Sequence, residues 1–439
     1  MKNFKVEPKS NSLKHILDSL IEGKLNYHNY IETIIERVKW VEPLVMSFVQ
    51  PAEFLIKNLK LLLNKSEKLS TDVFLEQTLF GIPVGFKDLY HVEGFPTCAG
   101  SKLPSDLFDS GEGSVVKRIR KAGAHILGKT VTTEFAYFAA GPTRNPNNID
   151  YSPGGSSSGS AAAVAAGIVP LSFGTQTIGS IIRPAAFCGV VGFKPSQYKI
   201  PTDGIIPLSP TLDQVGYFTS DVESTTLVYY LLCGQRENPK QFYRLCIPEG
   251  NYLKKANQEI LKLFEDFISQ LNSEQIEIIK INFLDNIDEI KEKHYKLLSA
   301  EAAMVHKDWF NKFKNLYHPK TVELIESGLK ITPQEIKDTI ESREEIRLEM
   351  KSFFELNDVD AIITPSTVEL PPIGLDYTGN PIMSLPWTFA GLPIINIPIA
   401  NYRENLPFGV QIVGKYFEDE VVLTIAGIIE RSIKQLQIL

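Results

Sequence analysis

From Leu79 onward, short apolar runs alternate with turns rich in glycine and proline, and this pattern constrains the fold more than any other feature. Such runs are typical of buried β-strands. A helical stretch at Ser114–Ala122 lies between two of them, and a closing helix is predicted at Asp419–Gln435. Strands that alternate with helices build an α/β sheet. The runs are Gly81–Phe86, Ala124–Leu127, Ile168–Phe173, Gly189–Phe193, Ala361–Thr364, Pro393–Ile399 and Pro407–Val413.

Two segments depart from this pattern. In residues 1–75, leucine and isoleucine recur at helical spacing, and we expect helices there with a strand at Leu44–Gln50 between them. Residues 248–356 are rich in lysine, glutamate, isoleucine and leucine, which predicts amphipathic helices around one strand, Ile276–Phe283. Because neither a linker nor a repeat interrupts the chain, we interpret all 439 residues as one domain with a helical insertion, rather than as separate domains.

Composition excludes several classes of function. The formal net charge is −7 and lysine and arginine form no dense block, which argues against a nucleic-acid partner. Neither a signal peptide nor an apolar run long enough to span a membrane is present. The histidines form no HExxH motif and the four cysteines no CxxC motif, so we expect no metal. These features favour a cytoplasmic protein that acts on small molecules without a cofactor.

Residues Gly123–Thr130 match the phosphate-binding pattern G-x(4)-G-K-[ST], but we reject a nucleotide site there. A phosphate loop follows a strand and opens a helix, so that its backbone amides surround the phosphate. Here a predicted helix comes first and the residues between the glycines are mostly apolar. We therefore predict a helix–turn–strand unit with Lys129 at the end of the strand.

Two clusters of small polar residues carry the candidate chemistry. Ser152–Ser160 is rich in serine and glycine and runs directly into the alanine-rich Ala161–Gly167, which predicts a tight loop that opens a buried helix. The second cluster is Gly174–Pro184, where the apolar run Ile168–Phe173 leads into a small polar turn that contains Ser180. A serine flanked by free backbone N–H groups suits an acyl-transfer nucleophile. Because neither a G-x-S-x-G motif nor a His–Asp set is evident, this serine needs another base.

Lys87 is the candidate base, because it follows an apolar run and is predicted to lie at a strand end. Burial would lower its pKa and make a neutral amine available near pH 7. The alternative is that Lys87 pairs with Asp88 on the surface and that Ser156 and Ser180 are ordinary loop serines.

Together these segments resemble the amidase signature family of serine amidohydrolases. Gly154–Ser160 and Gly174–Ser180 are similar to the family's two serine motifs, with the family's spacing between Ser156 and Ser180, and Gly81–Asp88 is similar to its lysine segment. The similarity covers about residues 80–220, the signature core, and 360–430. Further matching segments are Thr97–Ser101, Gly128–Thr130, Gly141–Pro146, Gly192–Pro195, Ala390–Pro393 and Leu406–Gly414.

The resemblance implies an α/β/α sandwich around a large mixed central β-sheet and a Ser–Ser–Lys triad. By position, Ser180 would be the nucleophile, Lys87 the base, and Ser156 the bridging serine, which in this family follows a cis peptide bond. The oxyanion hole would consist of the backbone N–H groups of Thr177, Ile178, Gly179 and Ser180. Gly155, Ser157, Gln176 and Arg183 would support the site.

The sequence departs from the family pattern at four positions. Gln176 replaces an aspartate, Ser158 and Ile178 replace glycines, and Ile182 replaces an arginine, with Arg183 one place later. Losing the aspartate and the arginine together leaves no unmatched charge. A β-branched side chain at Ile178 would crowd the acyl group, so we expect a narrowed substrate range rather than loss of activity.

The resemblance implies an amidohydrolase that cleaves carboxylic amides to an acid and ammonia or an amine through an acyl-enzyme on Ser180. Two alternatives remain open, namely the amidase subunit of a tRNA-dependent amidotransferase and a catalytically inactive binding protein of the same fold. A homodimer is compatible with the family. Because nothing in the sequence marks a charged pocket, aromatic or aliphatic amides are the expected substrates.

Overall fold

The computed structural model describes residues 11–66, 73, 76–108, 110–234, 240–271, 273–401 and 406–436. A ten-stranded sheet runs through the molecule in the order β2-β1-β3-β5-β4-β9-β10-β8-β6-β7. Pairs at both ends of the sheet are parallel and those in the middle antiparallel, so the sheet is mixed as expected. The strands are β1 Pro83–Lys87, β2 His125–Thr130, β3 Leu171–Gln176, β4 Val191–Lys194, β5 Gln214–Thr219, β6 Tyr243–Glu249, β7 Ile276–Asn282, β8 Ala361–Pro365, β9 Ile394–Asn401 and β10 Pro407–Gly414.

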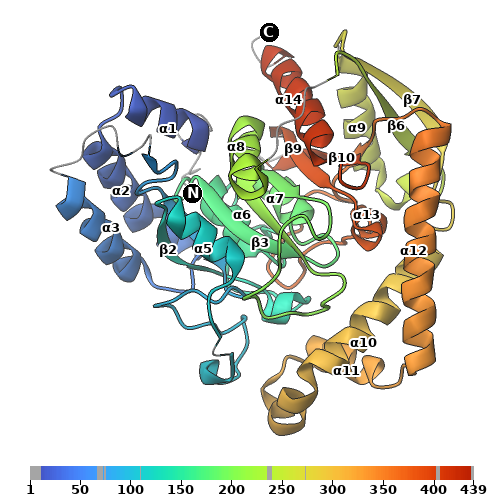
Figure 1. The fold of residues 1–439 in the computed structure, drawn as a ribbon, viewed down its shortest axis with the longest axis horizontal. Coiled ribbons are helices and arrows are strands. Elements are labelled where there is room, and N and C mark those ends of the chain that lie inside the picture. Colours follow the sequence, from blue (N-terminus) through green and yellow to red (C-terminus); the bar gives the residue numbers. More distant parts are fainter. Residues whose placement is uncertain are drawn as a thin grey trace.

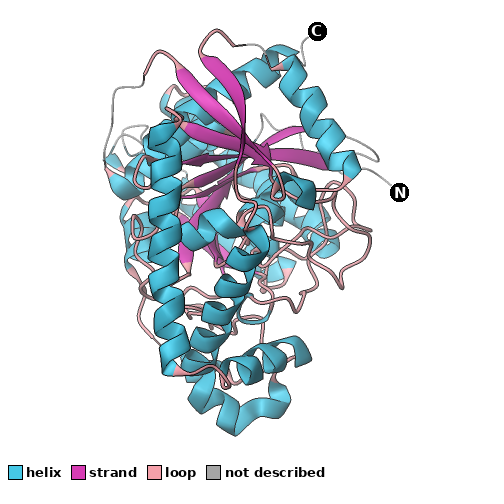
Figure 2. Ribbon diagram, turned by 90° about the vertical axis from the view of Figure 1, so that its right-hand side faces the viewer, coloured by secondary structure: helices cyan, strands magenta, loops and turns pink. Residues whose placement is uncertain are grey.

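Helices cover both sides of this sheet (Figure 2), which confirms the sandwich. Helices α6 and α7 pack against each other and the sheet, and α8 and α14 form a second such pair. The helices are α1 Leu13–Ile21, α2 Tyr27–Val45, α3 Ala52–Ser66, α5 Ser114–Lys121, α6 Ser158–Ala165, α7 Ile182–Cys188, α8 Val222–Cys233, α9 Gln258–Gln270, α10 Ile287–Phe313, α11 Pro319–Gly328, α12 Pro333–Leu356, α13 Leu385–Ala390 and α14 Asp419–Leu436.

Helix α6 is composed of small residues because other chain segments approach it closely. A Cβ atom at Gly159 would lie 2.2 Å from the Ser47 carbonyl oxygen and 2.3 Å from the Val131 nitrogen, so only glycine fits there. The Ser/Gly-rich loop before α6 contacts the ends of β1 and β3. The prediction of a tight loop that opens a buried helix is therefore confirmed.

The segment predicted as a helical insertion divides in two. Strand β7 confirms the expected strand and extends the sheet beside β6, while α9 packs on β8 and β10. Helices α10, α11 and α12 extend away from the sheet (Figure 1), and α10 and α12 both contact α13.

The prediction of a strand at Leu44–Gln50 is wrong. Helix α2 continues to Val45 because its buried face, which includes Val38 and Val41, keeps helical spacing to that point. The helix ends at Met46, whose φ is 53°. Beyond it, Phe48 makes a single β-bridge with Thr130. In the part of the chain that is described, none of the helices has the length and apolar character needed to cross a membrane.

Candidate active site

Lys87 is the last residue of β1, and its side chain is fully buried. Strands β1 and β3 are parallel, so their carboxyl ends meet at one edge of the sheet and bring Lys87 beside Thr175. The Lys87 Nζ atom lies 2.8 Å from the Ser156 Oγ atom and 2.8 Å from the Thr175 Oγ1 atom. The lysine that the sequence singled out thus contacts one of the two serines that it singled out.

The surroundings of Lys87 favour the neutral amine. Its pKa is lowered to about 7, chiefly by burial; the charge of Asp213 opposes this shift, and the charge of Arg183 adds to it. The Nζ atom donates to two hydroxyl groups and a backbone carbonyl, and among the described residues no carboxylate accepts a hydrogen bond from it. Near neutral pH, Lys87 is therefore a neutral amine in a large fraction of the molecules, and its nitrogen lone pair can accept a proton.

Asp88 does not pair with Lys87, so the alternative of a surface ion pair is wrong. Its Oδ1 atom accepts a hydrogen bond of 3.0 Å from the Nζ atom of Lys129, and both side chains are buried. Lys129 also donates to the Thr97 hydroxyl. It lies in β2, which follows α5, so Gly123–Thr130 forms the turn and the strand of the helix–turn–strand unit that we predicted.

Ser156 lies in the loop before α6, and the Gly155–Ser156 peptide bond is cis, as the resemblance implied. The Gly155 carbonyl accepts a hydrogen bond of 2.6 Å from the Arg183 Nη2 atom. Ser157 donates through its hydroxyl to the Thr175 carbonyl at 3.1 Å. Three of the residues expected to support the site therefore surround Ser156.

Ser180 lies in the turn that connects β3 to α7, and it is buried. The Gln176 side chain stabilises this turn, because its Oε1 atom accepts hydrogen bonds from the Ile181 and Ile182 N–H groups at 2.7 and 3.1 Å. Its Nε2 atom donates to the Thr388 hydroxyl. Among the hydrogen bonds of the described residues, none joins the hydroxyl groups of Ser156 and Ser180.

The backbone N–H groups of this turn are available to bind a ligand. Within the described ranges, the N–H groups of Thr177, Ile178, Gly179 and Ser180 donate to no protein acceptor. Free N–H groups that converge beside a serine stabilise negative charge on an attacked carbonyl oxygen. These are the four N–H groups that the resemblance implied.

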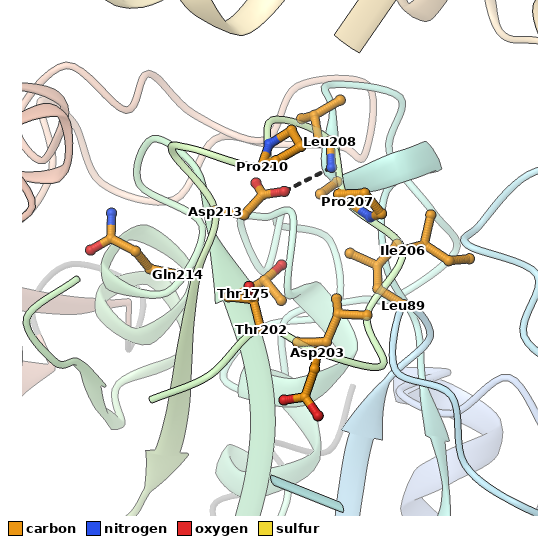
Figure 3. Close-up of a pocket in the computed structure, with 12 residues that line it drawn as sticks. Leu89, Thr175, Thr202, Asp203, Ile206, Pro207, Leu208, Pro210, Asp213 and Gln214 are labelled. Atoms are coloured by element: carbon orange, nitrogen blue, oxygen red, sulfur yellow. Dashed lines mark hydrogen bonds between the residues drawn. The ribbon is translucent and has the colours of Figure 1, made fainter. Parts of the chain in front are cut away.

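A cavity of about 390 Å³ borders this cluster (Figure 3). Thr175, which contacts Lys87, forms part of its wall, together with Asp213 and apolar side chains. Asp213 accepts hydrogen bonds from the Leu208 N–H at 2.8 Å and the Thr177 hydroxyl at 2.5 Å. Burial raises the pKa of Asp213 to about 6. The apolar lining consists of Leu89, Ala136, Ile205, Ile206, Pro207, Leu208 and Pro210.

Sequence reasoning missed four residues that contact the expected ones, namely Thr175, Asp213, His294 and Thr388. Thr175 stands beside Gln176 in the second serine motif, so alternation along β3 is a signal that could have identified it. The others have no such signal, because they reach the turn from elements far away in the sequence. In the described part of the chain, no group of three or more His, Cys, Asp or Glu side chains is arranged to hold a metal ion.

A family model described as Amidase matches residues 30–423. The chain belongs to the amidase family. A solved structure described as an amidase is 29% identical, with a TM-score of 0.83, and the match covers 96% of this chain and 99% of that one. A peptide amidase from Stenotrophomonas maltophilia is 24% identical, with a TM-score of 0.81 and coverage of 96% and 97%; this likeness shows the shared fold.

Curated relatives of this chain include subunits of glutamyl-tRNA(Gln) amidotransferases. The one from Sulfurihydrogenibium sp. is 29% identical, and the match covers 94% of this chain and 96% of the relative. The corresponding subunit from Fusobacterium nucleatum is 28% identical, with 97% of each chain covered. Membership of the family is therefore compatible with either an independent amidase or an amidotransferase subunit.

Proposed function

We propose that this protein hydrolyses carboxylic amides through an acyl-enzyme on Ser180. The contact of 2.8 Å between the buried Lys87 Nζ and the Ser156 Oγ carries this proposal, because it couples a base of suitable pKa to a serine. The free N–H groups beside Ser180 support it.

In the proposed reaction, neutral Lys87 accepts the Ser156 hydroxyl proton while Ser156 accepts the proton of Ser180. The Ser180 Oγ atom attacks the amide carbonyl carbon, and the N–H groups of the turn stabilise the oxyanion. The C–N bond breaks as the proton returns through Ser156 to the leaving nitrogen, which departs as ammonia or an amine. Water then gives a proton to the same relay and attacks the ester carbonyl carbon. The bond to the Ser180 Oγ atom breaks, and this atom takes the proton back from the relay as the acid is released.

In this proposal, the hydrogen bond between the hydroxyl groups of Ser156 and Ser180 forms when substrate binds. Catalytic hydrogen bonds are often long in an empty site and shorten in the substrate complex. The apolar walls of the neighbouring cavity, such as Ile206 and Leu208, favour an aliphatic or aromatic acyl group. Its volume of about 390 Å³ suits a small molecule rather than a folded protein.

A second candidate function is the ammonia-producing subunit of a tRNA-dependent amidotransferase. The curated relatives favour it, because the matches extend over nearly the full length of both chains. The two functions differ in a measurable way. An independent amidase releases ammonia from simple amides on its own, whereas a subunit of an assembly copurifies with partner chains and depends on them for full activity.

The test is to treat the purified chain with a reactive fluorophosphonate, measure the intact mass, and map the modified peptide. In parallel, ammonia release is measured on a panel of aliphatic and aromatic amides. We expect a single adduct on Ser180 and turnover without a partner, both lost in Ser180→Ala. Folded protein that gains no adduct and hydrolyses no amide would refute the proposal. An adduct without turnover, with partner chains copurifying, would favour the amidotransferase subunit.

A further inference from the structure

His294 reaches the candidate oxyanion turn from helix α10, in the insertion between the two segments that carry the family's motifs. Its Nε2 atom lies 2.9 Å from the Thr177 carbonyl oxygen, and its ring is fully buried. A carbonyl oxygen only accepts hydrogen bonds, so Nε2 must carry the proton and donate. The Nδ1 atom then holds a lone pair, and among the described residues it has no hydrogen-bond partner.

This contact matters because of the geometry of the peptide group. The Thr177 carbonyl and the Ile178 N–H belong to one planar trans peptide and point in opposite directions. A donor that holds the carbonyl therefore also sets the direction of the Ile178 N–H. Accepting a hydrogen bond at the oxygen also polarises the peptide and strengthens its N–H as a donor.

The next two peptides of the turn are held in the same way. The Thr388 hydroxyl donates to the Ile178 carbonyl at 2.6 Å, which orients the Gly179 N–H. The Arg183 N–H donates to the Gly179 carbonyl at 2.9 Å, which orients the Ser180 N–H. Three successive carbonyls thus accept hydrogen bonds, while the N–H groups of the same three peptides, those of Ile178, Gly179 and Ser180, donate to no acceptor among the described residues.

We infer that His294 is a positioning residue for the oxyanion hole, and that it acts by holding the Thr177–Ile178 peptide through its Nε2–H group. This inference rests on the proposed function. It gives helix α10 a role in the site that the sequence pattern of residues 248–356 did not indicate.

A second contact from α10 supports this role. Glu301 accepts hydrogen bonds from the Ser209 hydroxyl at 2.5 Å and the Thr211 hydroxyl at 2.7 Å, and so holds the loop that leads to Asp213. Asp213 in turn accepts from the Thr177 hydroxyl. The same helix therefore fixes Thr177 directly at its carbonyl and indirectly at its side chain.

His294 remains neutral where Lys87 titrates. Burial lowers the pKa of His294 to about 4, and the charge of Arg343 acts in the same direction. The donated hydrogen bond is therefore present across the range in which activity is expected to depend on Lys87. Loss of this bond should lower the rate without moving the pH profile.

The experiment compares His294→Leu, which removes the donor, with His294→Gln, whose amide N–H reaches the position of Nε2. A matched control is His306→Leu, because His306 is also buried on α10 and contacts the Tyr317 hydroxyl at 3.0 Å. The kcat and KM for an amide are measured between pH 6 and 9, together with thermal unfolding. Since losing an oxyanion donor costs about 10²–10³-fold in kcat, we expect His294→Leu to cost about 10- to 100-fold with KM nearly unchanged.

His294→Gln should recover most of this loss, and His306→Leu should lower stability while retaining kcat. Wild-type kcat in folded His294→Leu would overturn the inference, as would a Gln variant no faster than the Leu variant. If His294→Leu does not fold, His294→Asn takes its place, because this shorter amide does not reach Thr177. Absence of both adduct and turnover in the wild type would instead refute the proposed function.

Discussion

Asp88 follows Lys87 directly in the chain, yet the lysine that it binds is Lys129, at 3.0 Å on the neighbouring strand. The charge of Lys129 opposes the rise in the pKa of Asp88 that burial causes, and the charge of Asp88 opposes the fall in the pKa of Lys129. Lys87 contacts two hydroxyl groups instead. Two buried lysines at one end of the sheet thus meet different environments: a carboxylate opposes the fall in the pKa of Lys129, whereas among the described residues only neutral groups accept hydrogen bonds from Lys87.

The rate of acylation should depend on the protonation of Lys87. Burial lowers its pKa to about 7, so the amine is protonated and inactive below that pH and neutral above it. We expect kcat/KM to rise as pH increases through about 7, and Lys87→Met to remove acylation at every pH. A pH profile of fluorophosphonate labelling from 5.5 to 9 measures this, and a flat profile would contradict a lysine base.

Ser156 should be required for proton transfer but not for folding. Ser156→Ala leaves Lys87 without the hydroxyl group that it contacts, so labelling of Ser180 should slow by about 10²-fold or more, as for loss of a general base. Ser172→Ala is the matched control, because Ser172 is also buried and donates to the Gly85 carbonyl at 3.1 Å. Equal labelling rates in the two variants would show that Ser156 transfers no proton.

Breaking the Asp88–Lys129 pair should destabilise the fold strongly. Lys129→Met leaves a buried carboxylate without its cation, which costs about 3–5 kcal/mol. Urea unfolding would measure the loss, and adding Asp88→Asn should restore part of it. Lys293→Met, which breaks a partly exposed pair with Glu289 on α10, should cost about 0.5 kcal/mol or less. Similar losses in the two lysine variants would contradict a buried ion pair.

Glu42 should make stability fall as pH rises. It is 4% exposed, and burial raises its pKa to about 7, although hydrogen bonds from Ser47 and Phe48 oppose the shift. Between about pH 4.5 and 7 the unfolded chain loses this proton while the folded chain retains it, which costs up to about 3 kcal/mol. Glu42→Gln should therefore raise the melting temperature more at pH 8 than at pH 5. The exposed Glu36→Gln on the same helix should show no such difference.

Ile178 should restrict the acyl group. Its side chain is buried at the turn that carries the candidate oxyanion donors. Ile178→Ala removes bulk without the backbone freedom of glycine, so we expect the ratio of kcat/KM for a branched amide to that for acetamide to rise. If the ratio stays unchanged while both substrates are turned over, the Ile178 side chain does not contact the acyl group.

Prediction from the sequence succeeded where one local pattern determines the structure. Apolar runs between turns identified β1, β3 and β10, and the Ser/Gly motif identified the loop before α6. The prediction of a strand at Leu44–Gln50 failed because the first residues of this run belong to α2, whose buried side chains keep helical spacing as far as Val45. Strands β5 and β6 were missed too, because neither is a purely apolar run bounded by glycine and proline.

The candidate site was predicted in part for a similar reason. Lys87, Ser156 and Ser180 stand in dense motifs, but His294 stands in an ordinary amphipathic helix. Its importance arises from one contact with Thr177, more than a hundred positions earlier in the chain. A pattern along the sequence does not record such a contact, nor did it indicate that Asp88 would bind Lys129.

The pairing of β4 with β9 has a consequence for how the protein is made. In this pairing Gly192 lies opposite Asn396, about two hundred residues later in the chain. When Lys87, Ser156 and Ser180 have been synthesised, β9 has not, so one side of β4 still lacks its partner strand. Contacts between distant segments slow folding and leave strand edges exposed during translation. Thr388, which holds the Ile178 carbonyl, also emerges late. A nascent chain therefore carries all three candidate catalytic side chains long before they are held in a working arrangement.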